Sequence, residues 1–366
     1  MTIGGSMLLI IVPLMAAALT VLLRRSGTVS ALLAIIVPLG LAVIALRFPL
    51  DEPQAILGRI VVLETGDRIA IAFLFMTASA IFLSVWRSSP GWAYYPVGLA
   101  ILSLLAGALI IRPPLNEVYP SFVYSALFIA IASVLCVFPL QGGAPGRTSG
   151  VTRFIIVMSL ALPALLLADW ALGRLTQSPD SPDLTQATIL LVAVSFTLLL
   201  AIFPFHTWVP AVSREAPPLS TAFALNILLG AVVILLLDVL NGVRLVGGDP
   251  RMLELLRGAG LIMVGLGAVL AWTQIDLGRL LAYGALADMG AILFAIGLAS
   301  PAGLAAAFIM LIVRALSTGL MAMGMMLARE RYGGDSFAKL RGLIWRLPWA
   351  SLAIIAGGLS LAGLPP

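Results

Sequence analysis

The ionisable residues that could do chemistry in this chain are few, and two of them lie inside long apolar stretches. Asp288 lies about nine residues, or ~13 Å of helix, into one stretch, and Arg314 is similarly central in the next. An unpaired charge at the centre of a membrane costs at least ~2.5–3.5 kcal/mol, so both side chains are expected to face other helices and to pair with each other. Such a pair is a candidate proton or cation relay, and the alternative is a static ion pair that fixes two helices. Because arginine stays protonated, Arg314 suits tuning of Asp288 better than proton transfer.

A second set of candidates surrounds Pro204. This proline lacks a backbone donor and clashes with the preceding turn, which predicts a break or kink in its helix. His206 lies at the break, and histidine exchanges protons near neutral pH, but we favour a structural hydrogen bond to the broken backbone. Glu215 could take up protons from solution, although a solvated charge at the membrane interface explains it as well.

The composition indicates what kind of molecule holds these residues. Of the 366 residues, 61% are hydrophobic and 10% are charged, against roughly 45–50% and 25% in soluble domains. The mean hydropathy is +1.13. Too few charged side chains remain to solvate the surface of a protein of this size, so we expect an integral membrane protein in a lipid bilayer.

Several classes of site are excluded. The single cysteine, Cys136, cannot form an internal disulfide or a cysteine-based metal or iron–sulfur site, and one histidine cannot form a multi-histidine metal site. No phosphate-binding loop or dinucleotide fingerprint occurs in its required context. We therefore expect no cofactor bound by this chain. The net charge of +5 is spread thinly over short loops, which gives no indication of nucleic-acid binding.

Twelve apolar stretches have about the ~20 residues that a helix needs to cross a bilayer. They cover residues 6–23, 28–46, 69–86, 93–111, 119–139, 154–173, 187–208, 217–240, 258–274, 280–299, 301–328 and 347–366. The odd-numbered loops hold twelve Lys and Arg residues against eight in the even-numbered loops, which predicts cytoplasmic odd loops and an N-terminus outside. Residues 59–63 and 68–71, around a Gly-containing turn, predict a short β-hairpin on the outer face.

A second proline, Pro365, interrupts the twelfth stretch. Two Pro-interrupted helices that lie five helices apart are the pattern of transporters built from inverted repeats, whose sites lie at the discontinuities. The alternative is that Pro204 and Pro365 merely end helices at the membrane interface.

Four stretches carry a resemblance to a known family. Pro204–Pro210 reads Pro-Phe-His-Thr-Trp-Val-Pro, and Ala216-Pro217 follows after a short stretch that includes Arg214 and Glu215. The other three are Asp276–Tyr283 with Ala287–Gly290, then Arg314–Leu316, then Gly342–Pro366. In order and spacing, from roughly residue 92 to the end, the chain resembles the antiporter-like membrane subunits of respiratory complex I and of multisubunit sodium/proton antiporters.

The resemblance implies an all-α polytopic membrane protein of about twelve helices, with two inverted five-helix repeats and broken helices seven and twelve. It assigns residues 1–91 to N-terminal helices with the outer hairpin, residues 92–240 to the first repeat, and residues 258–366 to a second, truncated repeat. Because the family continues beyond this point of helix twelve, the chain is expected to be incomplete.

The resemblance also implies a polar axis that this chain lacks in part. The family usually carries a glutamate on helix five, lysines on helices seven and eight, and a charge on helix twelve. Here Leu199 and Gly230 occupy the two lysine positions, and no acidic residue lies between Glu117 and Asp169. The one lysine of the chain, Lys339, lies in a loop.

The resemblance implies a membrane subunit of a complex I-like assembly in the bacterial plasma membrane. This subunit would translocate protons or Na⁺, while other membrane subunits and hydrophilic redox subunits carry out NADH- and quinone-linked electron transport. Two alternatives stay open. The chain could be a non-pumping scaffold subunit of such a complex, or a standalone cation/proton antiporter that shares the fold.

Overall fold

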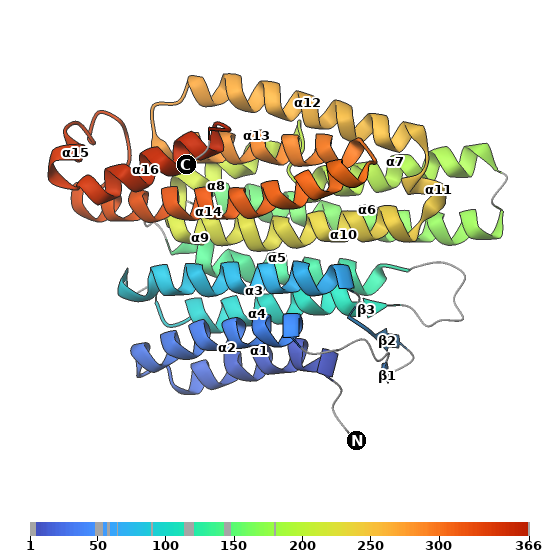
Figure 1. The fold of residues 1–366 in the computed structure, drawn as a ribbon, viewed down its shortest axis with the longest axis horizontal. Helices are drawn as coiled ribbons and strands as arrows, with labels where there is room; N and C mark the ends of the chain where they lie inside the picture. Colours follow the sequence, from blue (N-terminus) through green and yellow to red (C-terminus); the bar gives the residue numbers. More distant parts are fainter. Residues whose placement is uncertain are drawn as a thin grey trace. The chain divides into compact units, whose positions relative to one another are not determined.

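The computed structural model describes residues 5–47, 54–56, 59–63, 65–88, 91–112, 121–142, 148–178 and 181–364. Helices make up nearly all of this part of the chain (Figure 1). Within it, ten helices are long and apolar enough to cross a membrane, and two more apolar helices are shorter. These twelve coincide with the twelve predicted stretches, which confirms an all-α polytopic membrane protein.

The twelve membrane helices have the following bounds. They are α1 Gly5–Leu22, α2 Gly27–Arg47, α3 Thr65–Val85, α4 Tyr94–Ile110, α5 Val123–Gln141, α6 Ser149–Gln177, α7 Pro182–Leu199, α9 with α10 (Pro218–Phe223 and Leu229–Gly242), α12 Pro250–Trp272, α13 Leu277–Gly297, α14 Pro301–Tyr332 and α16 Pro348–Leu361. Short helices are η1 Trp86–Ser88, η2 Phe205–Thr207, α8 Trp208–Glu215, α11 Arg244–Gly247 and α15 Leu343–Arg346. The π-helical turn η3, Ala224–Leu228, joins α9 to α10.

The chain forms two compact units. Unit 1 contains Met1–Pro139, Met158–Phe196 and Ile227–Asp249, and unit 2 contains Leu140–Val157, Thr197–Asn226 and Pro250–Pro366. The repeat boundaries that the sequence suggests, 92–240 and 258–366, remain predictions.

In unit 1, α1 packs on α4 and α2 packs on α3. Polar contacts support both pairs: the Ser103 hydroxyl donates to the Ile10 carbonyl at 2.6 Å, and the Ser79 hydroxyl donates to the Ile35 carbonyl at 2.8 Å. Lipid offers the helices no hydrophobic incentive to associate, so such hydrogen bonds and close packing hold them together.

A small antiparallel sheet closes one end of unit 1. Its order is β1 Gln54–Ile56, β2 Arg59–Val61 and β3 Ile111–Arg112. The predicted strand at 59–63 is therefore present, but its predicted partner is wrong, because residues 68–71 lie in α3. Ile69 and Ile71 suit either structure, and Asp67 in the first turn of α3 favours the helix through its dipole.

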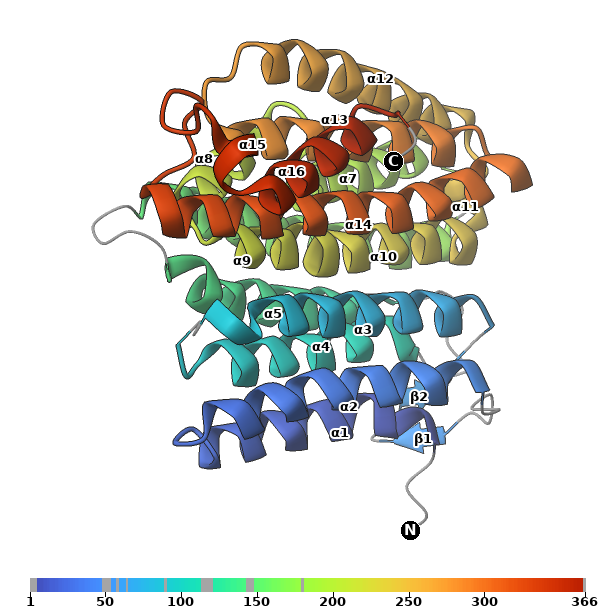
Figure 2. The same cartoon turned by 60° about the vertical axis from the view of Figure 1, so that its left-hand side comes forward.

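In unit 2, glycines bring helices into close contact. A Cβ on Gly290 of α13 would lie 2.6 Å from the Gly260 carbonyl oxygen of α12, and a Cβ on Gly357 of α16 would lie 2.6 Å from the Ser317 carbonyl oxygen of α14. Figure 2 shows α16 lying along α14. The methionines near the C-terminal end of α14 have different surroundings. Met321 and Met325 are buried in an apolar cluster with Leu277 and Leu281, whereas Met323 is exposed.

The predicted break at Pro204 is confirmed. The helix α7 ends at Leu199, Ala201 has a positive φ of 53°, and the Phe203–Pro204 peptide bond is cis. The one-turn η2 follows, and α8 begins at Trp208. The second predicted break is not testable in the same way, because α16 ends at Leu361 and Pro365 lies outside the described residues.

Candidate functional site

A buried polar cluster lies where α13, α14 and the π-helical turn η3 meet inside unit 2. Arg314 is near the middle of α14 and is 2% exposed. Its Nη1 donates to the Leu225 carbonyl oxygen of η3 at 3.0 Å. A π-turn shifts the backbone hydrogen-bond register of a helix, and such turns are frequent at functional sites. The guanidinium Nε is also buried and has no hydrogen-bond partner among the described residues.

The next residue of the π-turn, Asn226, also contacts α14. Its Nδ2 donates to the Thr318 hydroxyl at 2.7 Å, and that hydroxyl lies 2.6 Å from the Arg314 carbonyl oxygen, to which it donates. Both side chains are buried. The contacts of Arg314 and Asn226 therefore fix α14 against η3 at two successive residues.

Asp288 lies on α13, which packs against α14. Its side chain is half-buried, and its charge interacts with that of Arg314. The direct ion pair predicted between them is wrong, because no nitrogen–oxygen contact within 4.0 Å joins them in the described structure. The Nη1 of Arg314 donates instead to the Leu225 carbonyl oxygen.

A hydroxyl pair extends the polar face of α14 toward α16. The Ser317 hydroxyl lies 2.6 Å from the Ser360 hydroxyl, and both side chains are buried. Ser317 follows Arg314 by three residues and thus lies on the same helix face. The polar groups of unit 2 therefore run from η3 across α14 to the last turn of α16.

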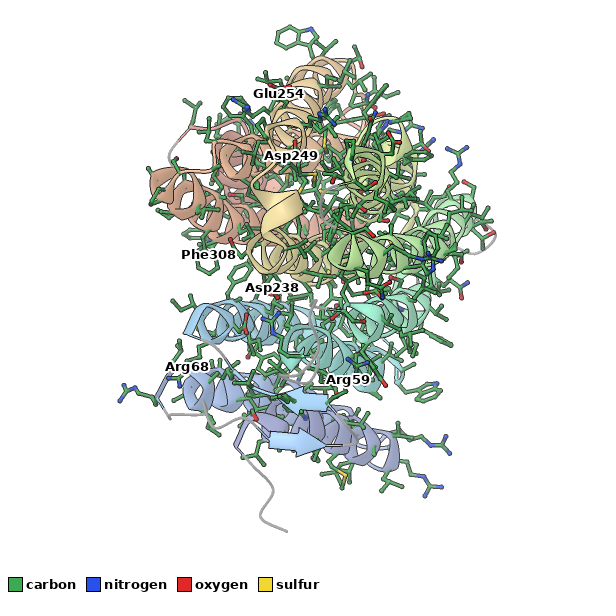
Figure 3. The ribbon with its side chains drawn as sticks, turned by 90° about the vertical axis from the view of Figure 1, so that its right-hand side faces the viewer. Arg59, Arg68, Asp238, Asp249, Glu254 and Phe308 are labelled. Atoms are coloured by element: carbon green, nitrogen blue, oxygen red, sulfur yellow. The ribbon has the colours of Figure 1, made fainter. Side chains whose placement is uncertain are left out.

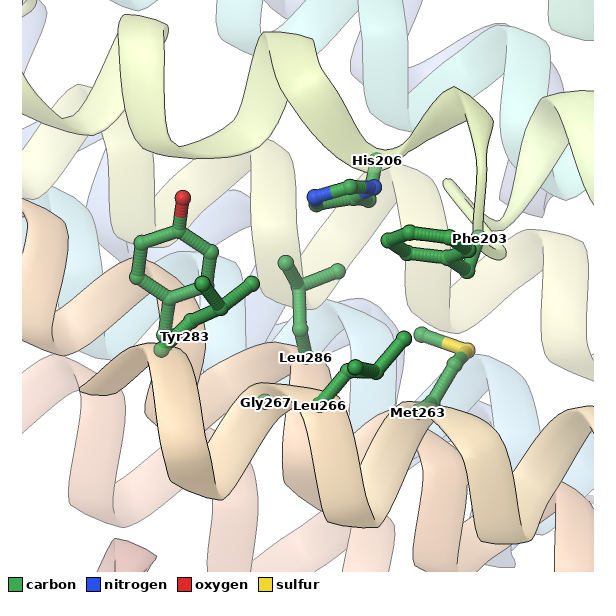
Figure 4. A pocket seen from close by; sticks show the side chains of 8 residues that line it. Phe203, His206, Met263, Leu266, Gly267, Tyr283 and Leu286 are labelled. Carbon is green, nitrogen blue, oxygen red and sulfur yellow. The ribbon is translucent and has the colours of Figure 1, made fainter. Parts of the chain in front are cut away.

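His206 lies apart from this cluster, at the break. Its ring stacks on Phe203 with a centroid distance of 4.7 Å, and the Tyr283 ring of α13 is 6.4 Å away. These three side chains and neighbouring apolar residues of α12 and α13 line a small pocket (Figure 4). The pocket is aromatic and aliphatic, so it offers few polar groups to an ion.

Glu215 has a structural role in this conformation. Its carboxylate accepts hydrogen bonds from the Ser149 hydroxyl at 2.6 Å and from the Gly150 backbone N–H at 2.8 Å. These groups form the N-terminus of α6, where a negative charge is favourable. Glu215 is also partly exposed, so the charge binds the α6 N-terminus from the edge of the structure.

Among the described residues, no group of three or more His, Cys, Asp or Glu side chains could hold a metal ion. The cluster around Arg314 has the chemistry of a charge pathway instead, with one buried cation, one half-buried carboxylate and hydroxyl and amide groups between helices.

Comparisons with known proteins identify the chain. Residues 150–366 match the family described as "NADH:quinone oxidoreductase/Mrp antiporter, TM". The chain belongs to this family. The matched residues include the break, the π-turn, Asp288 and Arg314.

Relatives and solved structures agree with the family. NADH-quinone oxidoreductase subunit N 1 of Solidesulfovibrio magneticus is 37% identical over 292 residues, which are 79% of this chain and 58% of that protein. A chain of the Mrp complex from Dietzia sp. DQ12-45-1b matches with a TM-score of 0.81 and 20% identity, over 97% of this chain and 43% of that one. A chain of respiratory complex I from Thermus thermophilus matches with a TM-score of 0.79 and 21% identity, over 97% and 80%. The chain spans about half the length of the curated relatives it matches.

The two positions where the resemblance implies lysines, on helices seven and eight, are occupied by Leu199 and Gly230. Leu199 is 2% exposed. A Cβ on Gly230 would lie 3.4 Å from the Leu74 side chain, within unit 1. Neither of these two residues has a polar side chain.

Sequence reasoning missed a charged cluster in unit 1. Arg112 Nη2 lies 3.0 Å from Asp67 Oδ2 and 3.3 Å from Asp238 Oδ2. Asp238, labelled in Figure 3, lies inside the apolar helix α10, which is the signal that could have found it. The other two members of the cluster, Asp67 in the first turn of α3 and Arg112 in β3, lie far from Asp238 in the sequence, and no local pattern connects them.

Proposed function

We propose that this chain is an ion-translocating membrane subunit of a complex I-like assembly, in which partner subunits carry out quinone-linked electron transport. The observation that supports this most is the position of Arg314. A buried guanidinium bound to the carbonyl of a π-turn faces a helix that carries a half-buried carboxylate, within the part of the chain that matches the family.

The chemistry of the cluster fits a proton, with Na⁺ as the alternative. Asp288 can gain or lose a proton or bind a cation, whereas Arg314 holds its proton. The arrival or departure of an ion at Asp288 therefore changes the local charge, while Arg314 keeps its own charge and its contact with η3. Thr318 and Asn226 hold α14 in place while that happens.

A second candidate is supported by Leu199 and Gly230. Leu199 is buried and Gly230 lies against the Leu74 side chain, at positions where the family was expected to carry lysines. A non-pumping scaffold subunit would show this pattern, and in that case the Arg314 contacts only fix helices. A standalone cation/proton antiporter would need flux by the purified chain in the absence of partner subunits.

We further propose the bacterial plasma membrane as the location, with the N-terminus outside and the odd-numbered loops in the cytoplasm. The excess of Lys and Arg in odd loops supports this orientation. Other membrane subunits and hydrophilic redox subunits are the proposed partners, by analogy with the relatives' names.

The test is Asp288→Asn in the native protein within its membranes. We expect electron transfer to be retained and the number of ions moved per electron to fall, because the amide cannot exchange a proton or hold a cation. The matched control is Asp183→Asn, in the exposed first turn of α7, which should change neither quantity. Asp288→Glu should recover part of the flux. An unchanged ratio in Asp288→Asn would favour the scaffold function.

A further inference from the structure

An ion pair at the C-terminal end of α14 joins three helices of unit 2. Arg329, in the last turn of α14, pairs with Asp335 at 2.6 Å between Nη2 and Oδ2. The same guanidinium donates to two carbonyl oxygens at the C-terminal end of α8, from Nη1 to Ala216 at 2.7 Å and from Nη2 to Ser213 at 3.0 Å. The carboxylate of Asp335 also accepts from the backbone N–H of Gly278, in the first turn of α13, at 3.1 Å.

The charges of this pair match the dipoles of the helices beside them. The last carbonyls of a helix have no partner within the helix and carry partial negative charge, and the first N–H groups carry partial positive charge. Arg329 lies at the negative end of α8, and Asp335 lies at the positive end of α13. Positive and negative groups therefore alternate from the carbonyls of α8 through Arg329 and Asp335 to the first N–H groups of α13. Each of the two side chains is attracted to both of its neighbours.

The space around the pair is closely fitted. A Cβ on Gly278 would lie 2.5 Å from the Ser213 carbonyl oxygen, 2.9 Å from Arg329 Nη2 and 3.1 Å from Asp335 Oδ2. Only glycine permits this approach of α13 to α8. The loop that carries Asp335 is itself bonded to the start of α13, since Leu277 N–H donates to the Asp335 carbonyl at 3.0 Å and Phe337 N–H donates to the Ile275 carbonyl at 3.0 Å.

The helix held in this way is the one that follows the break. The N-terminal end of α8 adjoins η2 and Pro204, where the chain has no continuous helix to support it. Its C-terminal end is bound through Arg329 on one side and through Glu215 to the α6 N-terminus on the other. Any movement at the break is therefore a movement about a fixed C-terminal end of α8.

We propose that Arg329 is a positioning residue for ion translocation: through its pair with Asp335 it holds the C-terminal end of α8 on α13 and α14 and so sets the geometry of the broken helix. The proposal rests on the proposed function. It also makes a separate structural claim, that α8 loses its attachment to α13 and α14 when the guanidinium is removed, while its contact with α6 through Glu215 remains.

The test compares Arg329→Gln with Arg331→Gln in the purified native assembly. Arg331 lies two residues further along α14 and is exposed, so Arg331→Gln is a control that removes one arginine from the same helix end without removing the contacts of Arg329. Two quantities are measured: hydrogen exchange of the backbone amides of residues 208–216 and 277–279, and ions moved per electron. We expect Arg329→Gln to raise exchange at both segments and to lower the ion ratio, and Arg331→Gln to do neither.

Two further variants separate this role from an ordinary salt bridge. Arg329→Lys keeps the charge but not the planar fork that reaches two carbonyls and a carboxylate together, so an intermediate result is expected and the variant remains informative if Arg329→Gln does not assemble. The exchange of partners, Arg329→Asp with Asp335→Arg, restores an ion pair but places each charge at the wrong helix end. We expect it not to restore either measurement, and full rescue would overturn the proposal.

The remaining outcomes distinguish the two proposals. Unchanged amide exchange in Arg329→Gln would overturn the inference directly. A normal ion ratio in Arg329→Gln together with a low ratio in Asp288→Asn would overturn the inference and leave the proposed function standing. Normal ratios in both variants would overturn the proposed function, and the role of Arg329 in translocation with it.

Discussion

At the level of single residues, Arg314 is a buried cation of unit 2 whose guanidinium donates to a backbone carbonyl. Arg314 is held by a carbonyl of η3, and Asn226 and Thr318 bond beside it. A buried polar group that loses its partner costs more than the bond contributed, because the group left behind stays desolvated. The residues around Arg314 should therefore depend strongly on one another.

Thr318→Val tests this dependence. The valine has the shape of threonine but leaves the Asn226 amide without its 2.7 Å acceptor, so we expect the free energy of unfolding to fall by about 1–3 kcal/mol. Adding Asn226→Leu should cost less than the sum of the two single changes. Unfolding by SDS titration in mixed micelles measures all three variants. Thr152→Val is the control, because that exposed hydroxyl donates to the carbonyl of Thr148, just before the start of its helix α6. Strictly additive effects at 226 and 318 would contradict the prediction.

At the level of elements, close backbone contacts and helix interruptions shape unit 2. The contact of α12 with α13 depends on Gly260 and Gly290, each of which leaves room for the other's carbonyl oxygen. In lipid, where apolar side chains gain little from meeting each other, such small-residue contacts are the main source of helix association.

Gly290→Ala should force α12 and α13 apart. The new Cβ would lie 2.6 Å from the Gly260 carbonyl oxygen and 2.8 Å from the Val264 backbone nitrogen, neither of which can move without its helix. We expect a loss of about 1–3 kcal/mol, seen as a lower thermal midpoint in detergent. Gly265→Ala on α12 is the control, since a Cβ there meets nothing within 4 Å and should stabilise slightly or have no effect. Equal midpoints for the two variants would contradict the close contact.

The elements also show what could be read from the sequence. Hydropathy predicted the twelve membrane helices, and Pro204 predicted the break, because both depend on local composition. The π-turn at Ala224–Leu228 has no such signal, since Asn226 and the Leu225 carbonyl find their partners on α14, far along the chain. Asp288 and Arg314 were predicted to be central and to bond each other. In the structure Arg314 is near the middle of α14, as expected, but its guanidinium donates to the backbone carbonyl of Leu225. A prediction that pairs charged side chains with each other does not consider backbone carbonyls as partners.

At the level of the whole molecule, the contacts within each unit agree with a chain that alternates across a membrane. In unit 2 the Arg329 contacts bring together the loops after predicted helices seven, nine and eleven. In unit 1 the Arg112 contacts join the segments after helices two and four to the end of helix eight. Three tryptophans at the Arg329 end, Trp272, Trp345 and Trp349, are 92%, 88% and 79% exposed, as in an interfacial aromatic belt.

Cysteine labelling can determine which end is cytoplasmic. Ala338 and Asn241 are exposed at an odd and an even loop, and Cys136 is buried and can be replaced by serine to give a background without other thiols. We expect an impermeant maleimide to label Asn241→Cys in intact cells and Ala338→Cys only in inverted vesicles. The reverse pattern would place the N-terminus in the cytoplasm and contradict the orientation drawn from the Lys and Arg counts.

The sheet of unit 1 constrains the order in which the chain can be made and folded. The strand β2 is synthesised before α3 and α4, but its partner β3 follows α4, so one edge of β2 stays open until both helices have entered the membrane. An open edge pairs readily with other strands. Arg59 of β2 lies 4.8 Å from the centre of the Tyr124 ring, and Tyr124 is synthesised even later than β3. Unit 1 therefore cannot complete its fold one helix at a time as the chain is synthesised. A pause in synthesis before residue 112 would leave β2 without its partner β3 and exposed outside the membrane.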